Sequence, residues 1–499
     1  MAAQHPSSRL PEITAVDSIS IAQENLTWTR AEASEQASCN ELLFVLKTAT
    51  KHNQKPDFLL FFLQEEAENK EQPFQLSVLQ VAEIPSEIHN RVITKLPDHF
   101  RAGIISGAGF TNEVDIVVST KSGLGLAPRV WKDVLEPLFQ LVAENESRET
   151  NNHDSTVDSS KSKHRVTFTE SAGTVRDFAK GLWDSRSLNG RARTVLLLSG
   201  DGGVVDILNG SDGHDRPEDC PPTIALLPLG TGNALFHSLH KPLYSDLGAT
   251  PLVHGLRTLF QGSSHDLPVF QASFSPGSRI VTFADKSTEA ANNGIAAQKE
   301  ETPISHLYGA VVASYGFHAT VVYESDTPEY RVHGDKRFGM VAQELLRESH
   351  PYAAKVSIRR SGSTAFEDIP RETHAYVLAA LVSNLERKFT ISPETKPLQS
   401  QLRLVHFGPI GGERTMDVMM KAYDEGSHIG MEWADGERVG YDAVDETRVV
   451  VLEDDERWRK VCIDGTIVEI PKGGHMSVKL LDHTTIKILA NPSITEEQA

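Results

Sequence analysis

Two short glycine-rich segments of the sequence contain the residue types that bind phosphate groups. In the first, LLLSGDGGVVDILNG (Leu196–Gly210), an apolar run ends at Ser199 and is followed by Gly200, Asp201 and Gly202. Glycines allow backbone amides to approach phosphate oxygens closely, and a carboxylate between them can accept a proton or contact a metal ion. A single Gly-Asp-Gly is also a common turn, so this segment alone does not establish a binding site.

The second segment, IALLPLGTGNALFHSLH, follows about thirty residues further along the chain. It joins another apolar run to a helical pattern through Gly230, Thr231, Gly232 and Asn233. The backbone amides at the amino end of a helix attract anions. Two such loops in one sheet favour a phosphate-binding site over two independent turns.

A third segment, IVVSTKSGLGLAP, has the same arrangement of strand, loop and helix, and its loop contains Lys121, Ser122 and Gly123. The Lys-Ser pair invites comparison with a Walker A loop. That motif needs glycines where Asp115 and Thr120 stand, so the segment is not a standard P-loop.

The elements that must position these loops form a repeated pattern of strand, loop and helix. Such a repeat is typical of a parallel α/β sheet, and ligands of open α/β sheets bind at the carboxyl ends of the strands. The pattern predicts strands at 113–120, 193–199 and 224–227, and helices at 127–142, 173–183 and 232–239.

The remainder of the chain has a different pattern. From Tyr308 onward, short alternating segments such as 375–382, 401–407 and 448–452 predict strands of a β-rich second lobe. Residues 41–80 also have mostly strand character, and they could form a small separate domain or add strands to that lobe. Polar stretches predict loops or linkers over the first 40 residues and at 145–164, 211–222 and 284–305.

Composition excludes several classes of function. The 499 residues carry a net charge of −19, which gives no general basis for nucleic-acid binding. The sequence has no secretory signal pattern and no apolar run long enough to span a bilayer, so we expect an intracellular protein without a transmembrane segment. Cys39, Cys220 and Cys462 are too far apart in sequence for a zinc-binding pattern, and neither a HExxH motif nor an esterase elbow is present.

The glycine motifs resemble those of a known family. SGDGG with Asp206 and a following Asn-Gly, and then PLGTGNAL, is similar to the catalytic lobe of the diacylglycerol, sphingosine and ceramide kinases. The likeness extends from about Asn112 to Leu489 and leans towards the sphingosine and ceramide branch. It implies a two-lobed α/β fold, in which an α/β sheet domain with Gly-rich loops precedes a β-rich, sandwich-like lobe.

The resemblance also implies an activity and a division of the chain. The expected activity is ATP-dependent, magnesium-dependent phosphorylation of a hydroxyl on a sphingoid base, ceramide or diacylglycerol. The expected location is cytoplasmic, with peripheral association at the membrane surface that holds the lipid substrate. The expected units are an N-terminal extension with strand character (1–110), a nucleotide-binding catalytic lobe (111–260) and a lipid-binding lobe (261–492).

Site residues follow from the matched motifs. Asp201 corresponds to the base that accepts the proton of the acceptor hydroxyl, and Asp206 to a family glutamate near the nucleotide. Arg331 and Arg337 correspond to basic residues that reach over the ATP phosphates, and Asp464 to an acid that organises magnesium and nucleotide. Asp201 and Asp464 could contact the metal through water. The other nucleotide contacts implied by the resemblance are Lys121, Ser122, Gly123, Thr169, Ser199, Gly200, Gly202, Gly230, Thr231, Gly232 and Asn233.

The sequence departs from the family pattern at several positions. Ser119 and Thr120 replace an Asn-Pro pair, and Thr466 replaces a glutamate. Val322 stands where sphingosine kinases carry the aspartate that binds the amino group of the lipid, although Glu324 is nearby. Two alternatives therefore remain: a catalytically impaired pseudokinase or lipid-binding scaffold, and an NAD kinase-like enzyme, whose fold shares the glycine turn.

Overall fold

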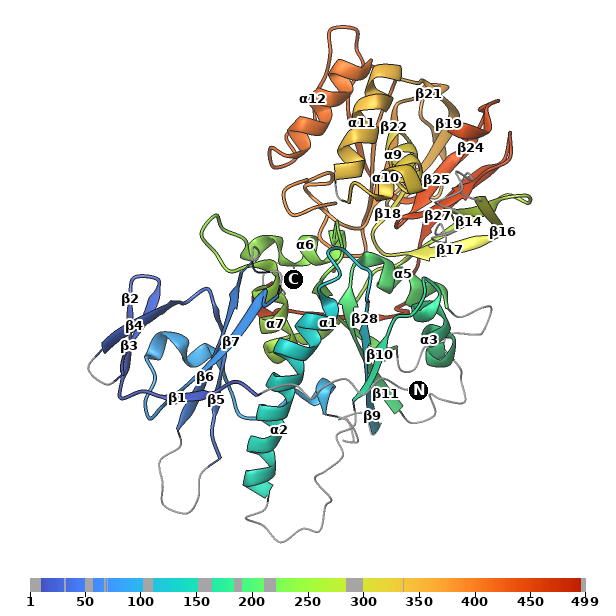
Figure 1. Ribbon diagram of the computed structural model, residues 1–499. Helices are drawn as coiled ribbons and strands as arrows, with labels where there is room; N and C mark the ends of the chain where they lie inside the picture. Colours follow the sequence, from blue (N-terminus) through green and yellow to red (C-terminus); the bar gives the residue numbers. More distant parts are fainter. Residues whose placement is uncertain are drawn as a thin grey trace.

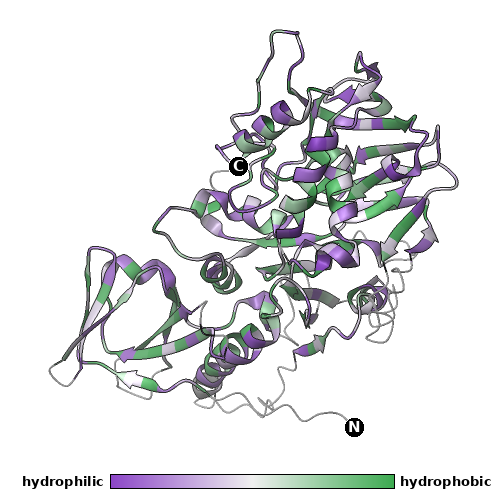
Figure 2. Cartoon of the chain, turned by 45° about the horizontal axis from the view of Figure 1, so that its top comes forward, coloured by the Kyte–Doolittle hydropathy of each residue, from purple (hydrophilic) through white to green (hydrophobic). Residues whose placement is uncertain are grey.

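The computed structural model divides into three parts (Figure 1). An N-terminal β part lies beside an α/β lobe, and a β-rich lobe lies at another side of the α/β lobe. The strands of both lobes consist mostly of hydrophobic residues, whereas the helices also carry hydrophilic residues (Figure 2). The structure describes residues 10–30, 33–49, 57–66, 69, 71–101, 111–150, 164–183, 191–210, 221–283, 299–334 and 336–494.

The N-terminal part contains a five-stranded sheet in the order β1-β7-β6-β5-β8 and a three-stranded sheet in the order β2-β3-β4. The prediction of loops over the first 40 residues was therefore wrong, because the short strands there have too few apolar residues to reveal a period. Residues 41–80 form strands of this separate sheet and do not extend the β-rich lobe. The elements are β1 Ile13–Ala15, β2 Ile19–Ala22, β3 Asn25–Arg30, β4 Ala33–Ser38, β5 Leu42–Lys47, β6 Phe58–Glu65, β7 Phe74–Val81, η1 Ser86–Arg91, β8 Val92–Ile93 and η2 Asp98–Phe100.

The α/β lobe is built on a six-stranded sheet in the order β10-β9-β11-β12-β28-β13, in which only β13 is antiparallel to its neighbour. Successive side chains of a strand point to opposite faces. Val195 and Leu197 accordingly pack with α3 and α5, whereas Leu196 and Leu198 pack with α2 and α7. The elements are β9 Thr111–Val118, α1 Ala127–Arg129, η3 Val130–Leu135, α2 Glu136–Thr150, β10 Arg165–Phe168, α3 Thr174–Trp183, β11 Arg191–Ser199, α5 Asp201–Asn209, β12 Thr223–Pro228, α6 Ala234–His240, η4 Lys241–Leu243, α7 Pro251–Gln261, β13 Ser263–Asp266 and β28 Lys487–Ala490.

The second lobe is a curled fourteen-stranded sheet covered by α9, α11 and α12. This arrangement, together with the parallel sheet of the first lobe, confirms the predicted two-lobed α/β fold class. The elements are β14 Phe270–Phe274, β15 Arg279–Phe283, β16 Lys299–Pro303, β17 His306–Gly309, β18 Val312–Gly316, α9 Phe317–Ser325, α10 Pro328–Arg331, α11 Lys336–Glu348, β19 Tyr352–Arg360, β20 Glu367–Asp368, β21 Thr373–His374, β22 Tyr376–Ala380, β23 Leu402–Phe407, α12 Gly412–Ala422, β24 Gly440–Val451, η5 Glu456–Trp458, β25 Lys460–Ile463, β26 Thr466–Glu469 and β27 His475–Leu480.

The predicted linkers have mixed outcomes. Helix α2 continues to Thr150, and β16 occupies part of the stretch predicted as a loop at 284–305. Residues 151–163, 211–220, which include Cys220, and 284–298 lie outside the described residues. Among the described helices, none combines the length and apolar character needed to cross a bilayer.

The chain crosses between the two lobes twice, and the crossings lie side by side. The amide of Leu267 donates to the Ile486 carbonyl at 3.1 Å, and the amide of Leu481 donates to the Val269 carbonyl at 2.9 Å. We keep the division into three units as a proposal, with β13 and β28 assigned to the α/β lobe because both belong to its sheet.

Arg257 of α7 attaches the N-terminal part to the α/β lobe. This buried guanidinium donates to the carbonyls of Cys39, Asn40 and Leu42 at 2.8–3.0 Å. Beside it, the rings of Phe44 and Phe260 pack with centroids 4.2 Å apart. The attachment therefore combines a charged hydrogen-bond cluster with apolar contact.

We predict that Arg257→Met destabilises this attachment by about 2 kcal/mol, because buried carbonyls lose a charged donor. Thermal unfolding should begin at a lower temperature, and limited proteolysis should cut first between residues 30 and 60. Arg414→Met is the matched control, because Arg414 pairs with Asp435 on the surface and should change stability by less than about 1 kcal/mol. Equal behaviour of the two variants would contradict the proposed role of Arg257.

Candidate active site

A pocket of about 490 Å³ lies at the carboxyl ends of β9, β11 and β12. All but two of the predicted site residues line it; Arg331 and Asp464 do not. Lining residues that the sequence motifs did not single out include Glu170, Ser171, Ala172 and Val175, which follow the end of β10 and have no distinctive spacing. The predicted residues in the lining are Lys121, Ser122, Gly123, Thr169, Ser199, Gly200, Asp201, Gly202, Asp206, Gly230, Thr231, Gly232, Asn233 and Arg337.

The two glycine turns touch each other backbone to backbone. A Cβ atom at Gly230 would lie 2.4 Å from the Cα atom of Gly200, and one at Gly200 would lie 2.9 Å from the Cα atom of Gly230. Neither backbone can give way without moving its strand. Glycine is therefore required sterically at both positions, independently of any contact with a ligand.

Asn233 closes the second turn. Its backbone is left-handed, with φ of 53°, and its side chain makes two bonds to Gly230. The Oδ1 atom accepts from the Gly230 amide at 2.8 Å, and Nδ2 donates to the Gly230 carbonyl at 2.9 Å. The Asn233 side chain thus holds the loop in shape, and the loop backbone is what faces the pocket.

Asp201 is the first residue of α5, and its carboxylate contacts the amino end of α6. Its two oxygens accept from the amides of Ala234 at 2.6 Å and Leu235 at 3.1 Å. Burial raises the pKa of this carboxyl to about 6, although the two amides act in the opposite direction. At neutral pH the group is thus an anchored carboxylate at the edge of the pocket, with lone pairs left to accept a proton.

Asp206 lies further along α5 and also faces the pocket. Burial raises its pKa to about 6, and the positive charge of Arg176 opposes the shift. Unlike Asp201, it accepts no hydrogen bond from a described residue. Of the two aspartates that line the pocket, Asp206 is therefore the one whose oxygens are not engaged by a described donor.

The Ser119–Thr120 pair, where the sequence departs from the family pattern, is integrated into the pocket wall. The amide of Thr120 donates to Thr169 Oγ1 at 2.9 Å, and Thr120 Oγ1 donates to the Thr169 carbonyl at 2.8 Å. Ser119 Oγ and Ser122 Oγ are 2.6 Å apart. A proline at position 120 could not donate the first of these bonds, so the threonine connects β9 to β10 in a way that the usual pair cannot.

The two arginines carried over from the resemblance have different environments. Arg337 lines the pocket, and its buried Nε atom has no hydrogen-bond partner among the described residues. Arg331 instead donates through Nε and Nη2 to Asp326, at 3.1 and 2.8 Å, and does not line the pocket. The structure therefore brings one arginine to the glycine loops and holds the other at the end of α9.

Asp464 lies behind the pocket. Its oxygens accept from the amides of Ala310, Val311 and Val312 at 2.6–3.2 Å, and these bonds brace the turn between β17 and β18. Burial raises its pKa to about 7, and the nearby charge of Asp201 adds to the shift. Its carboxylate is thus committed to backbone amides, which differs from the expected contact with nucleotide or magnesium.

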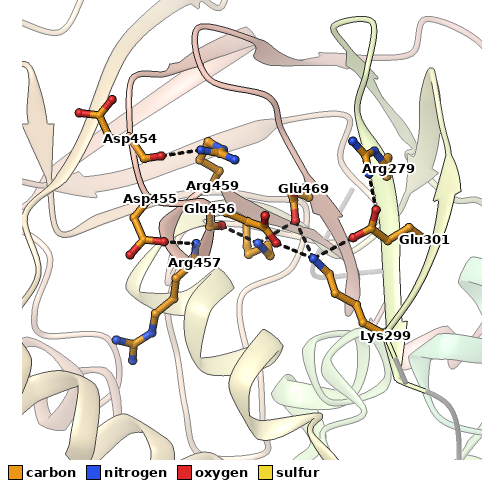
Figure 3. Close-up of polar contacts among 10 residues, drawn as sticks. Arg279, Lys299, Glu301, Asp454, Asp455, Glu456, Arg457, Arg459 and Glu469 are labelled. Atoms are coloured by element: carbon orange, nitrogen blue, oxygen red, sulfur yellow. Dashed lines mark hydrogen bonds and ion pairs between the residues drawn. The ribbon is translucent and has the colours of Figure 1, made fainter. Parts of the chain in front are cut away.

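A second acidic group resembles a metal site but contains its own cation. Glu301, Glu456 and Glu469 are the one set of potential ligands within the described ranges whose oxygens lie close enough together for a metal ion. The ammonium of Lys299 lies among them, at 2.9, 2.7 and 3.1 Å (Figure 3). Lys460 adds a second ammonium 3.0 Å from Glu469. These side chains therefore neutralise one another in an ion-pair network that joins β16, β26 and η5.

The pocket, in contrast, fits a magnesium–nucleotide complex. Arg337 lines the pocket, and its buried Nε is a donor without a partner among the described residues, beside a lining rich in glycine backbone and hydroxyl groups. Lys121 adds a cation, and Asp206 adds a carboxylate for a hydrated metal ion. Such a combination binds phosphate oxygens and neutralises their charge.

Comparison with known proteins agrees with this geometry. Residues 116–271 match the family model described as the diacylglycerol kinase catalytic domain. A search of curated proteins finds no match.

Solved structures with a similar fold include a diacylglycerol kinase from Bacillus anthracis str. Sterne, at 15% identity and a TM-score of 0.45, covering 77% of this chain and 98% of that one. Another protein of that organism, provisionally named a diacylglycerol kinase, has 14% identity and a TM-score of 0.46 over 77% of this chain and 98% of its own. The assignment to a family rests on the family model. Its match includes all of β11 and β12 and the last part of β9, the three strands that end at the pocket.

Proposed function

We propose that this lipid kinase, whose residues 116–271 match the diacylglycerol kinase catalytic domain, uses ATP and that its acceptor is the hydroxyl of a neutral lipid. Diacylglycerol and ceramide are the two acceptors of this kind in the family's range. A sphingoid base differs from them by its cationic amino group, which needs a carboxylate partner in the lipid-binding lobe.

The observation that carries this choice is the state of the acidic groups on and after α9. Glu324 accepts bonds from Arg457 Nε at 2.7 Å and Arg457 Nη2 at 3.3 Å, and the same guanidinium also pairs with Glu348, so Glu324 is already engaged in an ion-pair network. Asp326 is paired with Arg331 in the same way. Val322 is half-buried against Cys462 and Ile467 and brings no charge. An amine bound here would therefore have to compete with an arginine for its partner.

Phosphoryl transfer depends chiefly on alignment and on charge neutralisation. The glycine turns would hold the phosphates by backbone amides, with Arg337 and Lys121 balancing their charge. Bound magnesium would add further neutralisation of the phosphate oxygens, and Asp206 is the residue we propose for contact with its hydration shell. Asp201 would accept the proton of the lipid hydroxyl as the hydroxyl oxygen attacks phosphorus.

The acceptor also requires contact with a membrane. Since the substrate is a lipid and no described helix can cross a bilayer, we propose peripheral association with a membrane surface. Asp201 and the lipid-binding lobe must then both be reachable from the bilayer while the protein stays outside it.

The first test is a lipid panel with purified protein and magnesium ATP. We predict that ceramide or diacylglycerol is phosphorylated at least about tenfold faster than sphingosine, because an unpartnered amine would be desolvated in the site. Val322→Asp, which adds a carboxylate to α9, should narrow this difference, whereas Val322→Ala should not. Preference for sphingosine would overturn the neutral-lipid proposal. Labelled phosphate on NAD alone, or nucleotide binding without any transfer, would point to the NAD kinase-like or scaffold alternative.

The second test replaces the proposed base. We predict that Asp201→Asn lowers kcat by about 100-fold or more, because the hydroxyl loses its proton acceptor. The variant should also lose about 1 kcal/mol of stability, since an amide can accept from only one of the Ala234 and Leu235 amides. Asp177→Asn is the control, because Asp177 pairs with Lys180 on the exposed side of α3. Full activity of Asp201→Asn would remove this residue from the mechanism.

The third test is the pH dependence of kcat. A base works in its deprotonated form, so a pKa of about 6 for Asp201 predicts a rate that rises with pH up to about 6 and then levels off. An exposed aspartate would level off near pH 4. If the acid limb lies near pH 4 in the wild type, the raised pKa of Asp201 does not govern the reaction.

A further inference from the structure

Each helix that follows a glycine turn carries one polar side chain that binds the backbone of the second lobe. In α5 this residue is Asn209. Its Oδ1 atom accepts from the amide of Tyr308 at 2.9 Å, and its Nδ2 atom donates to the carbonyl of Tyr308, also at 2.9 Å. Asn209 therefore pairs with one residue of β17 much as a neighbouring strand would.

In α6 the corresponding residue is Ser238. Its hydroxyl donates to the carbonyl of Asn384 at 3.1 Å and accepts from the amide of Asn384 at 2.9 Å. Both residues are almost fully buried, with exposed fractions of 2% and 1%. The Asn384 side chain in turn donates to Thr390 Oγ1 at 3.1 Å, so the bonded turn of the second lobe is itself braced.

The packing of α5 leaves little choice of residue at its end. A Cβ atom at Gly210 would lie 2.3 Å from the Cβ of Ala179 in α3, so this helix end fits only without a side chain there. Asn209 consequently faces β17, where its amide can match both backbone groups of Tyr308. The Asn209–Gly210 pair therefore determines where α5 ends and that its end contacts β17.

These contacts link the reacting groups of one lobe to the other lobe. Asp201 begins α5 and Asn209 ends it, while Ala234, which binds Asp201, begins the helix that carries Ser238. The chain crosses between the lobes at 267–269 and 481–486. These two segments are hydrogen-bonded to each other through their backbones and can act as a hinge. The two side chains are further points of attachment between the lobes, on the helices that start at the pocket.

We propose that Asn209 and Ser238 form an interlobe latch that sets the second lobe at a fixed angle to the glycine turns. They are positioning residues, because neither lines the pocket and both act through α5 and α6. The inference rests on the proposed function in one respect, namely that the second lobe presents the lipid hydroxyl to Asp201. Without the latch, nucleotide still binds to the first lobe, but the hydroxyl no longer lies reliably in line with the phosphate.

If Asn209 and Ser238 only stabilised the fold, their substitution would not lower kcat selectively. The test therefore measures turnover and nucleotide binding separately. We predict that Asn209→Ala lowers kcat for lipid phosphorylation by about 10-fold or more, because misplacement of about 1 Å is enough for such a loss. The nucleotide Kd should rise by a smaller factor than kcat falls, because Arg337 is the one pocket-lining residue among those described that the second lobe contributes. Ser238→Ala should act in the same direction, and the double variant should lose more than either single one.

Asn112→Ala is the matched control. Asn112 is also buried, and its Nδ2 atom donates to the carbonyls of Asp98 and His99 at 3.1 and 2.9 Å, but these bonds do not reach the second lobe. This variant should lose stability and keep its kcat. If Asn209→Ala keeps kcat within twofold of the wild type, or if Asn112→Ala loses as much turnover, the latch is wrong. Should Asn209→Ala fail to fold, Asn209→Asp keeps the bond accepted from the Tyr308 amide and removes those that Nδ2 donates to the Tyr308 and Val205 carbonyls, and it should still lower kcat more than it raises the nucleotide Kd.

A second measurement separates failure of the latch from failure of the proposed function. Fluorescent labels on the two lobes, at positions 177 and 417, report the distance between them without any substrate. We expect a broader distance distribution in the Asn209→Ala, Ser238→Ala double variant than in the wild type or in Asn112→Ala. An unchanged distribution contradicts the latch, whereas absence of lipid phosphorylation by the wild type contradicts the proposed function and leaves the distance test valid.

Discussion

The contact between Gly200 and Gly230 is the constraint on which the site depends. Two strand ends can approach to this separation only if neither residue has a side chain. Their approach brings the start of α5 against the start of α6, so that Asp201 reaches the amides of Ala234 and Leu235. Nucleotide-binding backbone and proposed base are therefore products of one packing contact, and a larger residue at either glycine would disturb both.

The carboxylate oxygens of Asp201 consequently have two roles. They accept hydrogen bonds from the start of α6, and they are proposed to accept the proton of the lipid hydroxyl. The α6 amides hold the carboxylate in place and favour its charge, while burial disfavours that charge and raises the pKa. A base with a pKa near 6 is more basic than an exposed aspartate and is still deprotonated at neutral pH. Asp464 behind it is buried in a similar way, and the charge of Asp201 raises the pKa of Asp464 further, while each carboxylate braces a separate turn.

The glycine turns were predictable from sequence because a few adjacent residues define them. Arg331 and Arg337 show the limit, since one motif suggested the same role for both, yet both pair with Asp326 and only Arg337 lines the pocket. Asp464 was assigned to the nucleotide from the matched motif, and its bonds to three backbone amides about 150 positions earlier could not be foreseen from sequence. Asn209 belongs to the Asn-Gly pair of the motif, but neither its interlobe contact nor that of Ser238 is signalled in sequence, because their partners are backbone groups of the other lobe. Contacts within one turn leave a pattern in sequence, whereas contacts between lobes do not.

The departures from the family pattern change the site without dismantling it. Thr120 uses an amide hydrogen that proline lacks, and its two bonds to Thr169 tie together the ends of β9 and β10. Val322 brings no charge, and the neighbouring Glu324 is paired with Arg457, so we propose that this departure bears on the lipid acceptor and not on phosphate transfer. Thr466 stands beside Asp464, whose bonds to backbone amides are complete without a second acid. Arg337, whose buried Nε has no partner among the described residues, lines the same pocket as the glycine turns, so this pocket keeps a donor suited to an anion.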